Sequence, residues 1–228
     1  LVSAGTYYEN INFNGKNIAL IGEDRETTII DGGGSGTVVT FFNNSGNPLL
    51  SNFQIINGEG NSGDIGGHSN GGGIYCNWSN PILSNLIISQ NSSYGAGCGL
   101  FIEGSTNINI IDSEISNNST ENNGGGIYML NSTVYANNVT IVNNTASLGG
   151  GIFMDNIQPA NSEIYFDNSI IANNQSSSLT QGNGIYYATA QNTSTYMNNS
   201  NFYNPNEDNS DGDSNLGNLL SVNGNMNL

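Results

Sequence analysis

Side chains that could bind a metal ion gather near the end of the sequence. The segment NEDNSDGDSN at 206–215 carries the candidate ligands Glu207, Asp208, Asn209, Asp211 and Asp213. Hard cations such as Ca²⁺ prefer several carboxylate and amide oxygens on a flexible loop. The spacing matches a calcium loop only in part, because the terminal bidentate Glu is missing. A calcium site and a solvated acidic turn therefore both stay open. Glu59 with Asp64 is a weaker second calcium candidate.

A repeated phrase supplies the frame in which other candidate residues must be judged. The phrases GGGIY, GCGLF, GGGIY, GGGIF and GNGIY place an aliphatic residue at 74, 100, 127, 152 and 185, in steps of 26, 27, 25 and 33 residues. Midway between them, an aliphatic residue is followed three positions later by Asn, as in ISNN at 115–118 and IVNN at 141–144. Each unit thus holds short runs with a period of two, separated by polar turns, and no helical periodicity.

This pattern predicts an all-β fold, a parallel β-helix (β-solenoid) of about nine coils of roughly 25 residues. Successive coils would pair as parallel strands. The inward columns of the first strand are predicted to hold Ile74, Cys76, Leu100, Ile102, Ile127, Met129, Ile152, Met154, Ile185 and Tyr187. Those of the second strand are predicted to hold Ile55, Ile88, Ile115, Ile141, Ile171 and Phe202.

The Asn of each second phrase forms a further column, Asn91, Asn118, Asn144 and Asn174. We expect these residues in turns, where Asn tolerates the left-handed region and stacked amides can bond along the axis. The glycines are expected where the backbone takes a positive φ or passes close to its neighbour. Cys76 and Cys98 lie four positions apart along the strand register, about 13 Å, so no disulfide is expected.

An outward row of aromatic residues is the main candidate binding feature. If the aliphatic residue of each phrase points inward, the next residue points outward, which gives the column Tyr75, Phe101, Tyr128, Phe153 and Tyr186. Trp78 follows at a turn and would extend the row, unless it is partly buried there. The row could contact sugar rings or another protein. The alternative is a structural ladder that stiffens this face or is covered by the 57–70 loop.

Carboxylates for catalysis are sparse. Glu103 and Asp155 share a column two coils apart with Leu130 between them, which places them roughly 10 Å from each other and is loose even for an inverting glycosidase pair. His68 lies in a glycine-rich insertion. We expect it to be an exposed loop residue, and the alternative is a catalytic or ligand role.

Composition excludes several partners. The chain has 228 residues, a net charge of −16 and only Lys16 and Arg25 as cations. This balance excludes nucleic acid as a partner and disfavours acidic polysaccharides and anionic membranes. No stretch reaches the roughly 20 apolar residues of a membrane helix, so membrane insertion is not expected.

The phrases carry a resemblance to known families. GTYYENINFNGKNIALIGEDRETTIIDGG at 5–33 resembles the opening coils of pectate-lyase-like right-handed parallel β-helix proteins. The GGGIY and IxxN phrases resemble the GGA(I/L/V) and FxxN repeats of polymorphic outer-membrane proteins. The whole chain is most similar to Asn- and Gly-rich β-helix regions of large secreted or surface proteins of marine bacteria. This resemblance implies right-handed winding and an extracellular or cell-surface location, and it is weak for activity.

We therefore expect one parallel β-helix domain at 1–228, a fragment of a longer secreted protein. Its parts would be N-terminal coils at 1–36, an inserted loop at 57–70, regular coils at 71–208 and an irregular coil at 209–228. The expected function is a non-catalytic rigid rod for adhesion, glycan binding or end-to-end or side-by-side assembly. The alternative is a carbohydrate-active enzyme, a polysaccharide lyase or glycoside hydrolase, of the pectate-lyase-like superfamily.

Overall fold

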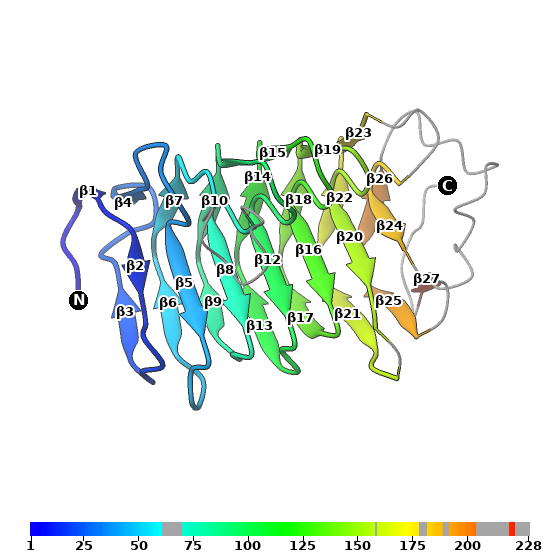
Figure 1. The fold of residues 1–228 in the computed structure, drawn as a ribbon, viewed down its shortest axis with the longest axis horizontal. Helices are drawn as coiled ribbons and strands as arrows, with labels where there is room; N and C mark the ends of the chain where they lie inside the picture. The colour runs from blue at the N-terminus through cyan, green and yellow to red at the C-terminus, as the bar shows by residue number, and fades with distance from the viewer. Residues whose placement is uncertain (61–69, 158, 178–181, 189–191, 204–218, 222–228) are drawn as a thin grey trace.

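The computed structural model describes residues 1–60, 70–157, 159–177, 182–188, 192–203 and 219–221. Within these ranges the chain is all-β, with no helix, and it winds as a parallel solenoid (Figure 1). It follows that the described part contains no helix that could cross a membrane.

Three long sheets run along the solenoid, and every pairing between their strands is parallel. Sheet 1 consists of β1 (Gly5–Tyr8), β4 (Thr28–Asp31), β7 (Gln54–Ile56), β10 (Ile87–Ser89), β14 (Glu114–Ser116), β18 (Thr140–Val142), β22 (Ile170–Ala172) and β26 (Asn201–Tyr203). Sheet 2 consists of β2 (Ile11–Asn12), β5 (Val39–Phe42), β8 (Ile74–Asn77), β12 (Leu100–Glu103), β16 (Ile127–Leu130), β20 (Ile152–Asp155) and β24 (Ile185–Tyr187).

Sheet 3 consists of β3 (Ala19–Ile21), β6 (Leu49–Ser51), β9 (Ile82–Ser84), β13 (Ile108–Ile111), β17 (Thr133–Asn137), β21 (Ser162–Asp167), β25 (Thr193–Asn198) and β27 (Leu219–Ser221). A short sheet lies between sheets 1 and 2 in sequence and consists of β11 (Ser92–Ser93), β15 (Ser119–Thr120), β19 (Thr145–Ala146) and β23 (Gln175–Ser176). The long sheets stack seven or eight strands in the described residues, so the count of nine coils is not confirmed.

The inward columns are confirmed. Ile74, Leu100, Ile127, Ile152 and Ile185 are paired strand to strand along sheet 2. In sheet 1 the aliphatic column from Ile55 to Ile171 is fully buried, and Phe202 packs against the same core half-buried. Each apolar side chain therefore rests on its counterparts in the coils before and after it, which gives one continuous core.

The Asn column forms a buried amide ladder, as expected. Asn91 Nδ2 donates to Asn118 Oδ1 at 2.9 Å, and the Asn118 and Asn144 amides continue to Asn144 and Asn174 at 3.0 Å each. The expected left-handed backbone at these residues is wrong. The residue before each of them takes the positive φ instead, for example Asn117 at 54° and Asn143 at 57°. The turn is thus made by an exposed residue, which leaves the next Asn free to point inward.

At the other two corners, serine hydroxyls form the hydrogen bonds that join successive coils. Between sheets 2 and 3, Ser105 Oγ accepts from Ser79 N at 3.2 Å and Ser132 Oγ accepts from Ser105 N at 3.2 Å. Between sheets 3 and 1, Ser169 Oγ accepts from Val139 N at 3.0 Å. Buried backbone N–H groups that leave a strand at a corner would otherwise lack acceptors, so these hydroxyls hold successive coils in register.

Both expectations for the glycines are confirmed. The first glycine of the phrase takes a positive φ, as at Gly97 with 66° and Gly124 with 72°. The third glycine lies against the neighbouring coil, because a Cβ on Gly99 would meet Gly126 O at 2.6 Å and Asn118 Nδ2 at 2.9 Å. Any larger residue there would push the coils apart.

Candidate functional site

The predicted aromatic row is a continuous ladder on the outer face of sheet 2. Its members are in register along β8, β12, β16, β20 and β24, with ring centroids 5.1 to 5.3 Å apart and planes within 17° of parallel from Tyr75 to Tyr186. Stacking at this distance follows from the strand spacing, since identical positions in successive coils repeat at about 4.8 Å.

The ladder is covered rather than open. Tyr75 is 8% exposed and Phe101 and Phe153 are each 4% exposed, whereas Tyr128 and Tyr186 are half-buried. Ala96, in the turn before Gly97, packs with Tyr75 and Phe101 in one apolar cluster. Because the ring faces stack on one another, a ligand would meet only their edges. This geometry favours the structural role that the sequence left open, and binding by the ladder stays a prediction.

Tyr128 is a ladder residue with ionisable neighbours, Asp155 and Glu103. Burial raises the pKa of its phenol, the negative charges of Asp155 and Glu103 add to this rise, and the resulting pKa is about 12. Desolvation and nearby anions both disfavour the phenolate. The hydroxyl of Tyr128 therefore stays protonated at physiological pH and can serve as a hydrogen-bond donor, not as a base.

The two candidate catalytic carboxylates lie where the repeat predicts. Glu103 pairs with Leu130, and Leu130 pairs with Asp155, so two strand spacings separate the acids. Glu103 Oε2 accepts from Asn77 Nδ2 at 2.7 Å, and Asp155 Oδ1 accepts from Asn156 N at 2.8 Å. Leu130 between them offers no proton-transfer group, so the register brings the acids onto one face without making a close pair.

Trp78, which was predicted to extend the ladder, is an exposed residue. It lies one residue after β8, at the corner between sheets 2 and 3, and its side chain is 64% exposed. Its backbone N donates to Glu103 O at 2.9 Å. Trp78 is thus a largely exposed aromatic residue of this edge, and its part in the row stays a prediction.

A second ladder, on sheet 3, was missed by sequence reasoning. Tyr135, Tyr165 and Tyr196 are stacked at 5.1 and 4.4 Å, and Tyr135 is 43% exposed. Tyr165 Oη donates to Glu163 Oε2 at 2.8 Å. The alternation SEIYFD and TSTYMN carries the signal, since each Tyr follows a buried residue by one position. Because these rings also stack face to face, a ligand would contact only their edges.

An open hollow of about 210 Å³ lies beside the short sheet. Its lining consists of Glu59, Ser92, Ser93, Tyr94, Ser119, Thr120 and Glu121. Glu59 was expected to act with Asp64, which lies outside the described residues, and the structure supplies Glu121 and several hydroxyls instead. Such a lining could hold sugar hydroxyls by hydrogen bonds. The described residues contain no group of three or more His, Cys, Asp or Glu side chains suited to a metal ion.

Two of the sequence-based candidates fall outside the described part of the chain. The calcium candidate of Glu207, Asp208, Asn209, Asp211 and Asp213 lies at 204–218, and His68 lies at 61–69. Both stay predictions. The two cysteines are described and are free and buried, as expected.

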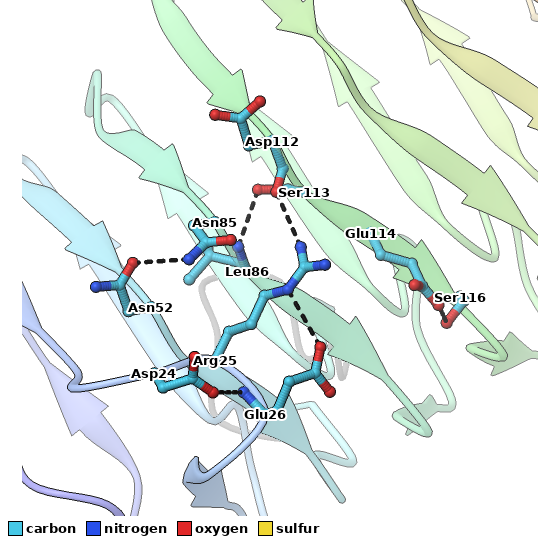
Figure 2. Close-up of polar contacts among 10 residues, drawn as sticks. All are labelled: Asp24, Arg25, Glu26, Asn52, Asn85, Leu86, Asp112, Ser113, Glu114 and Ser116. Carbon is cyan, nitrogen blue, oxygen red and sulfur yellow. Dashed lines mark hydrogen bonds and ion pairs between the residues drawn. The ribbon is translucent and has the colours of Figure 1, made fainter.

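Arg25 is held at the corner between sheets 3 and 1 (Figure 2). Its guanidinium donates through Nη1 to Asp112 O at 3.1 Å, and its Nε lies 3.3 Å from Glu26 Oε1. Asp112 follows β13, so the side chain reaches along the axis past the coils that carry Asn52 and Asn85. This cation is therefore engaged away from sheet 2 and does not serve an anionic substrate there.

Comparison with known proteins supports one part of the resemblance. Residues 112–129 match the model of the Chlamydia polymorphic membrane protein repeat. This segment holds an IxxN phrase and the GGGIY phrase that follows it, which form β14, β15 and β16. No curated protein and no solved structure matches the chain.

Proposed function

We propose that this chain is a non-catalytic module at the cell surface or outside the cell, a rigid rod for adhesion, glycan binding or surface assembly. The observation that supports it most is the continuous axial bonding of the solenoid, in which core columns, amide ladder and serine columns all join successive coils. The repeat match at 112–129 supports the location, because the proteins named in that family are membrane proteins.

The finer family assignment belongs to the same proposal. We infer right-handed winding, because parallel strands joined by a crossover are almost always connected with that hand. The pectate-lyase-like superfamily and the surface β-helix proteins of marine bacteria are the proposed relatives. They rest on the N-terminal segment 5–33 and on the Asn- and Gly-rich phrases.

The proposed partners follow from charge and from exposed strand edges. A net charge of −16 disfavours nucleic acid and acidic polymers. Parallel solenoids can meet end to end or side by side through unpaired edges. Neutral glycans and further copies of the chain are therefore the partners that this surface suits best.

Labelling of intact cells tests the location. An antibody against the chain should label cells that make the protein before they are permeabilised, and a cytoplasmic marker should stay unlabelled. Labelling that appears only after permeabilisation would contradict the surface module.

Co-sedimentation with insoluble neutral and acidic polysaccharides tests the absence of catalysis. We expect retention on neutral polymers with no release of oligosaccharides, with calcium or with a chelator. Release of oligosaccharides would contradict the rod and favour the enzyme alternative, with Glu103 and Asp155 as the first acids to replace.

A further inference from the structure

We propose that Trp78, with Glu103 beside it, binds a neutral pyranose unit of a glycan. The inference deepens the proposed function, since a surface module is the setting in which such a site meets glycans. The site lies at the edge of sheet 2, where β8 and β12 enter the corner toward sheet 3.

The indole is laid flat on the neighbouring coil. A Cβ built on Gly104 would lie 2.8, 2.9 and 3.1 Å from Cε2, Cδ2 and Cε3 of Trp78. Nearly equal distances to three adjoining ring atoms place the Gly104 backbone against the face of the indole and not its edge. Because 64% of Trp78 is exposed and Gly104 lies against one face of the ring, we infer that the opposite face is open to solvent. Unlike the stacked ladders, this ring offers a whole face.

The backbone at Trp78 is unusual for a bulky residue. Its φ is 49°, and the same corner position in neighbouring coils holds Asn43, Gly104 and Asn131, which are residue types that tolerate positive φ. A large side chain in this region costs roughly 1–2 kcal/mol. The fold forms this corner with Asn or Gly elsewhere, so the tryptophan is not required for folding, and strain of this kind clusters at binding sites.

A carboxylate lies at the same corner as Trp78, whose backbone N donates to Glu103 O. Glu103 precedes Gly104, and its carboxylate is fixed by the 2.7 Å bond from Asn77 Nδ2. The carboxylate keeps acceptor positions for sugar hydroxyls. Phe42, which pairs with Asn77 in register, is 38% exposed on the same edge. An aromatic face beside a fixed carboxylate suits a pyranose, which has an apolar C–H face and a rim of hydroxyls.

Charge selects the class of sugar. Glu103 and a net charge of −16 repel uronic acids and sulfated sugars. Arg25 is held by Asp112 O and Glu26 at another corner, so it does not offset this charge. Neutral pyranoses of the gluco or galacto type, with several axial C–H bonds on one face, fit the site best.

The sequence makes the test direct, because Trp78 is the only tryptophan of the chain. Indole fluorescence is excited at the red edge, where tyrosine does not absorb, and neutral and acidic oligosaccharides are titrated into the full chain. Neutral gluco- or galacto-oligosaccharides should shift the emission to the blue and protect it from acrylamide quenching. The acidic ones should leave it unchanged. No response to any neutral sugar, or an equal response to polyuronate, would overturn the proposal.

Variants separate binding from folding. Trp78→Asn introduces the residue type that Asn43 and Asn131 provide at this positive-φ position. The free energy of unfolding of the variant should therefore be equal to or higher than that of the wild type. Affinity electrophoresis in neutral polysaccharide should show binding about tenfold weaker or worse. Glu103→Leu, which repeats Leu130 of the next coil, should weaken binding as well. Tyr8→Ala removes another exposed aromatic, 77% exposed at the end of β1, and should leave binding unchanged.

Unchanged affinity in Trp78→Asn would overturn the site even if the chain binds glycan elsewhere. Failure of the Trp78 site can also be told apart from failure of the proposed function. Surface labelling with no sugar response at Trp78 would sink this inference and leave the rod intact. A sugar response at Trp78 together with oligosaccharide release would keep the site and sink the non-catalytic rod.

Discussion

At the scale of single residues, the amide ladder shows how a buried polar column can stabilise an apolar core. Asn144 Oδ1 accepts from the backbone N and from Nδ2 of Asn118, both at 3.0 Å. Its own Nδ2 donates to Ile115 O at 2.9 Å and to Asn174 Oδ1 at 3.0 Å. Every donor and acceptor of the amide thus has a partner, and loss of one amide leaves several buried groups unpaired.

Replacement of Asn144 by Ala should therefore lower the free energy of unfolding by about 3 kcal/mol, since each unpaired buried group costs about 1–3 kcal/mol. Urea unfolding followed by circular dichroism measures this loss. Asn137→Ala is the matched control: Asn137 is exposed at the end of β17, and its replacement should change stability by no more than about 0.5 kcal/mol. Equal effects of the two changes would contradict the ladder's role.

The two buried thiols should make the free energy of unfolding depend on pH in the alkaline range. Burial raises the pKa of Cys76 and of Cys98 from 9.0 to about 12. The unfolded thiols lose their protons near pH 9, while the folded ones keep theirs, so the unfolded state binds fewer protons above pH 9. The stability from these thiols is complete below pH 9 and falls as pH rises toward 12, by up to about 1.4 kcal/mol per pH unit for each group.

Cys98→Ser tests this contribution, because a serine hydroxyl can also donate to Asn91 O, the acceptor of the Cys98 thiol. The variant should show a shallower fall in unfolding free energy between pH 9 and 11, measured by urea titration at each pH. In the native wild type at neutral pH, a thiol reagent should modify neither cysteine. Rapid modification of the folded chain would show that the thiols are not buried.

At the scale of elements, the three glycines of the phrase have two different roles. The first needs a positive φ, and the third, such as Gly99, needs space because Gly126 O and Asn118 Nδ2 lie against it. Gly33 offers a comparison, since its φ is 62° and no atom lies within 4 Å of an added Cβ. Strand spacing in sheet 2 thus depends on the absence of a side chain, not only on backbone freedom.

Gly99→Ala should destabilise the chain more than Gly33→Ala. The Gly33 change costs about 1 kcal/mol through φ alone. The Gly99 change must also displace a backbone carbonyl and the amide ladder, so we expect a loss of about 2 kcal/mol or more. Thermal unfolding of both variants measures the difference. A smaller loss at Gly99 than at Gly33 would contradict the close-approach role.

At the scale of the whole molecule, charge is the main unbalanced force. The chain carries 18 acidic residues against 2 basic ones, and among the described residues one ion pair, Arg25 with Glu26, is formed. The remaining carboxylates repel one another along the rod. Such repulsion destabilises the folded state and is screened by salt.

The unfolding temperature should therefore rise as potassium chloride increases from about 0.01 to 0.15 M, over which the Debye length falls from about 30 to 8 Å. Differential scanning calorimetry in a chelator-containing buffer measures this shift without calcium. At pH 4, where many carboxylates are protonated, the same salt change should have a smaller effect. A fall in unfolding temperature with salt at neutral pH would contradict dominant self-repulsion.

The sequence alone determined the columns of the solenoid. Five glycine phrases in register place an aliphatic residue such as Ile74 inward and the next residue, such as Tyr75, outward. This follows because side chains alternate along a strand and one repeat makes one coil. The same logic predicted the Asn ladder and separated Cys76 from Cys98. These predictions do not depend on which turns lie over the outer faces of the sheets.

Only the tertiary structure decided what lies over the outward faces and how each corner turns. The rings of Tyr75 and Phe101 are buried in a cluster with Ala96 of the neighbouring turn, and a strand pattern does not record that cover. The left-handed residue is Asn117 and not Asn118, because neighbouring asparagines are equivalent in propensity and only the core selects which one points inward. The sequence also does not record that the ring of Trp78 lies against Gly104 of the next coil, which follows from the tertiary structure.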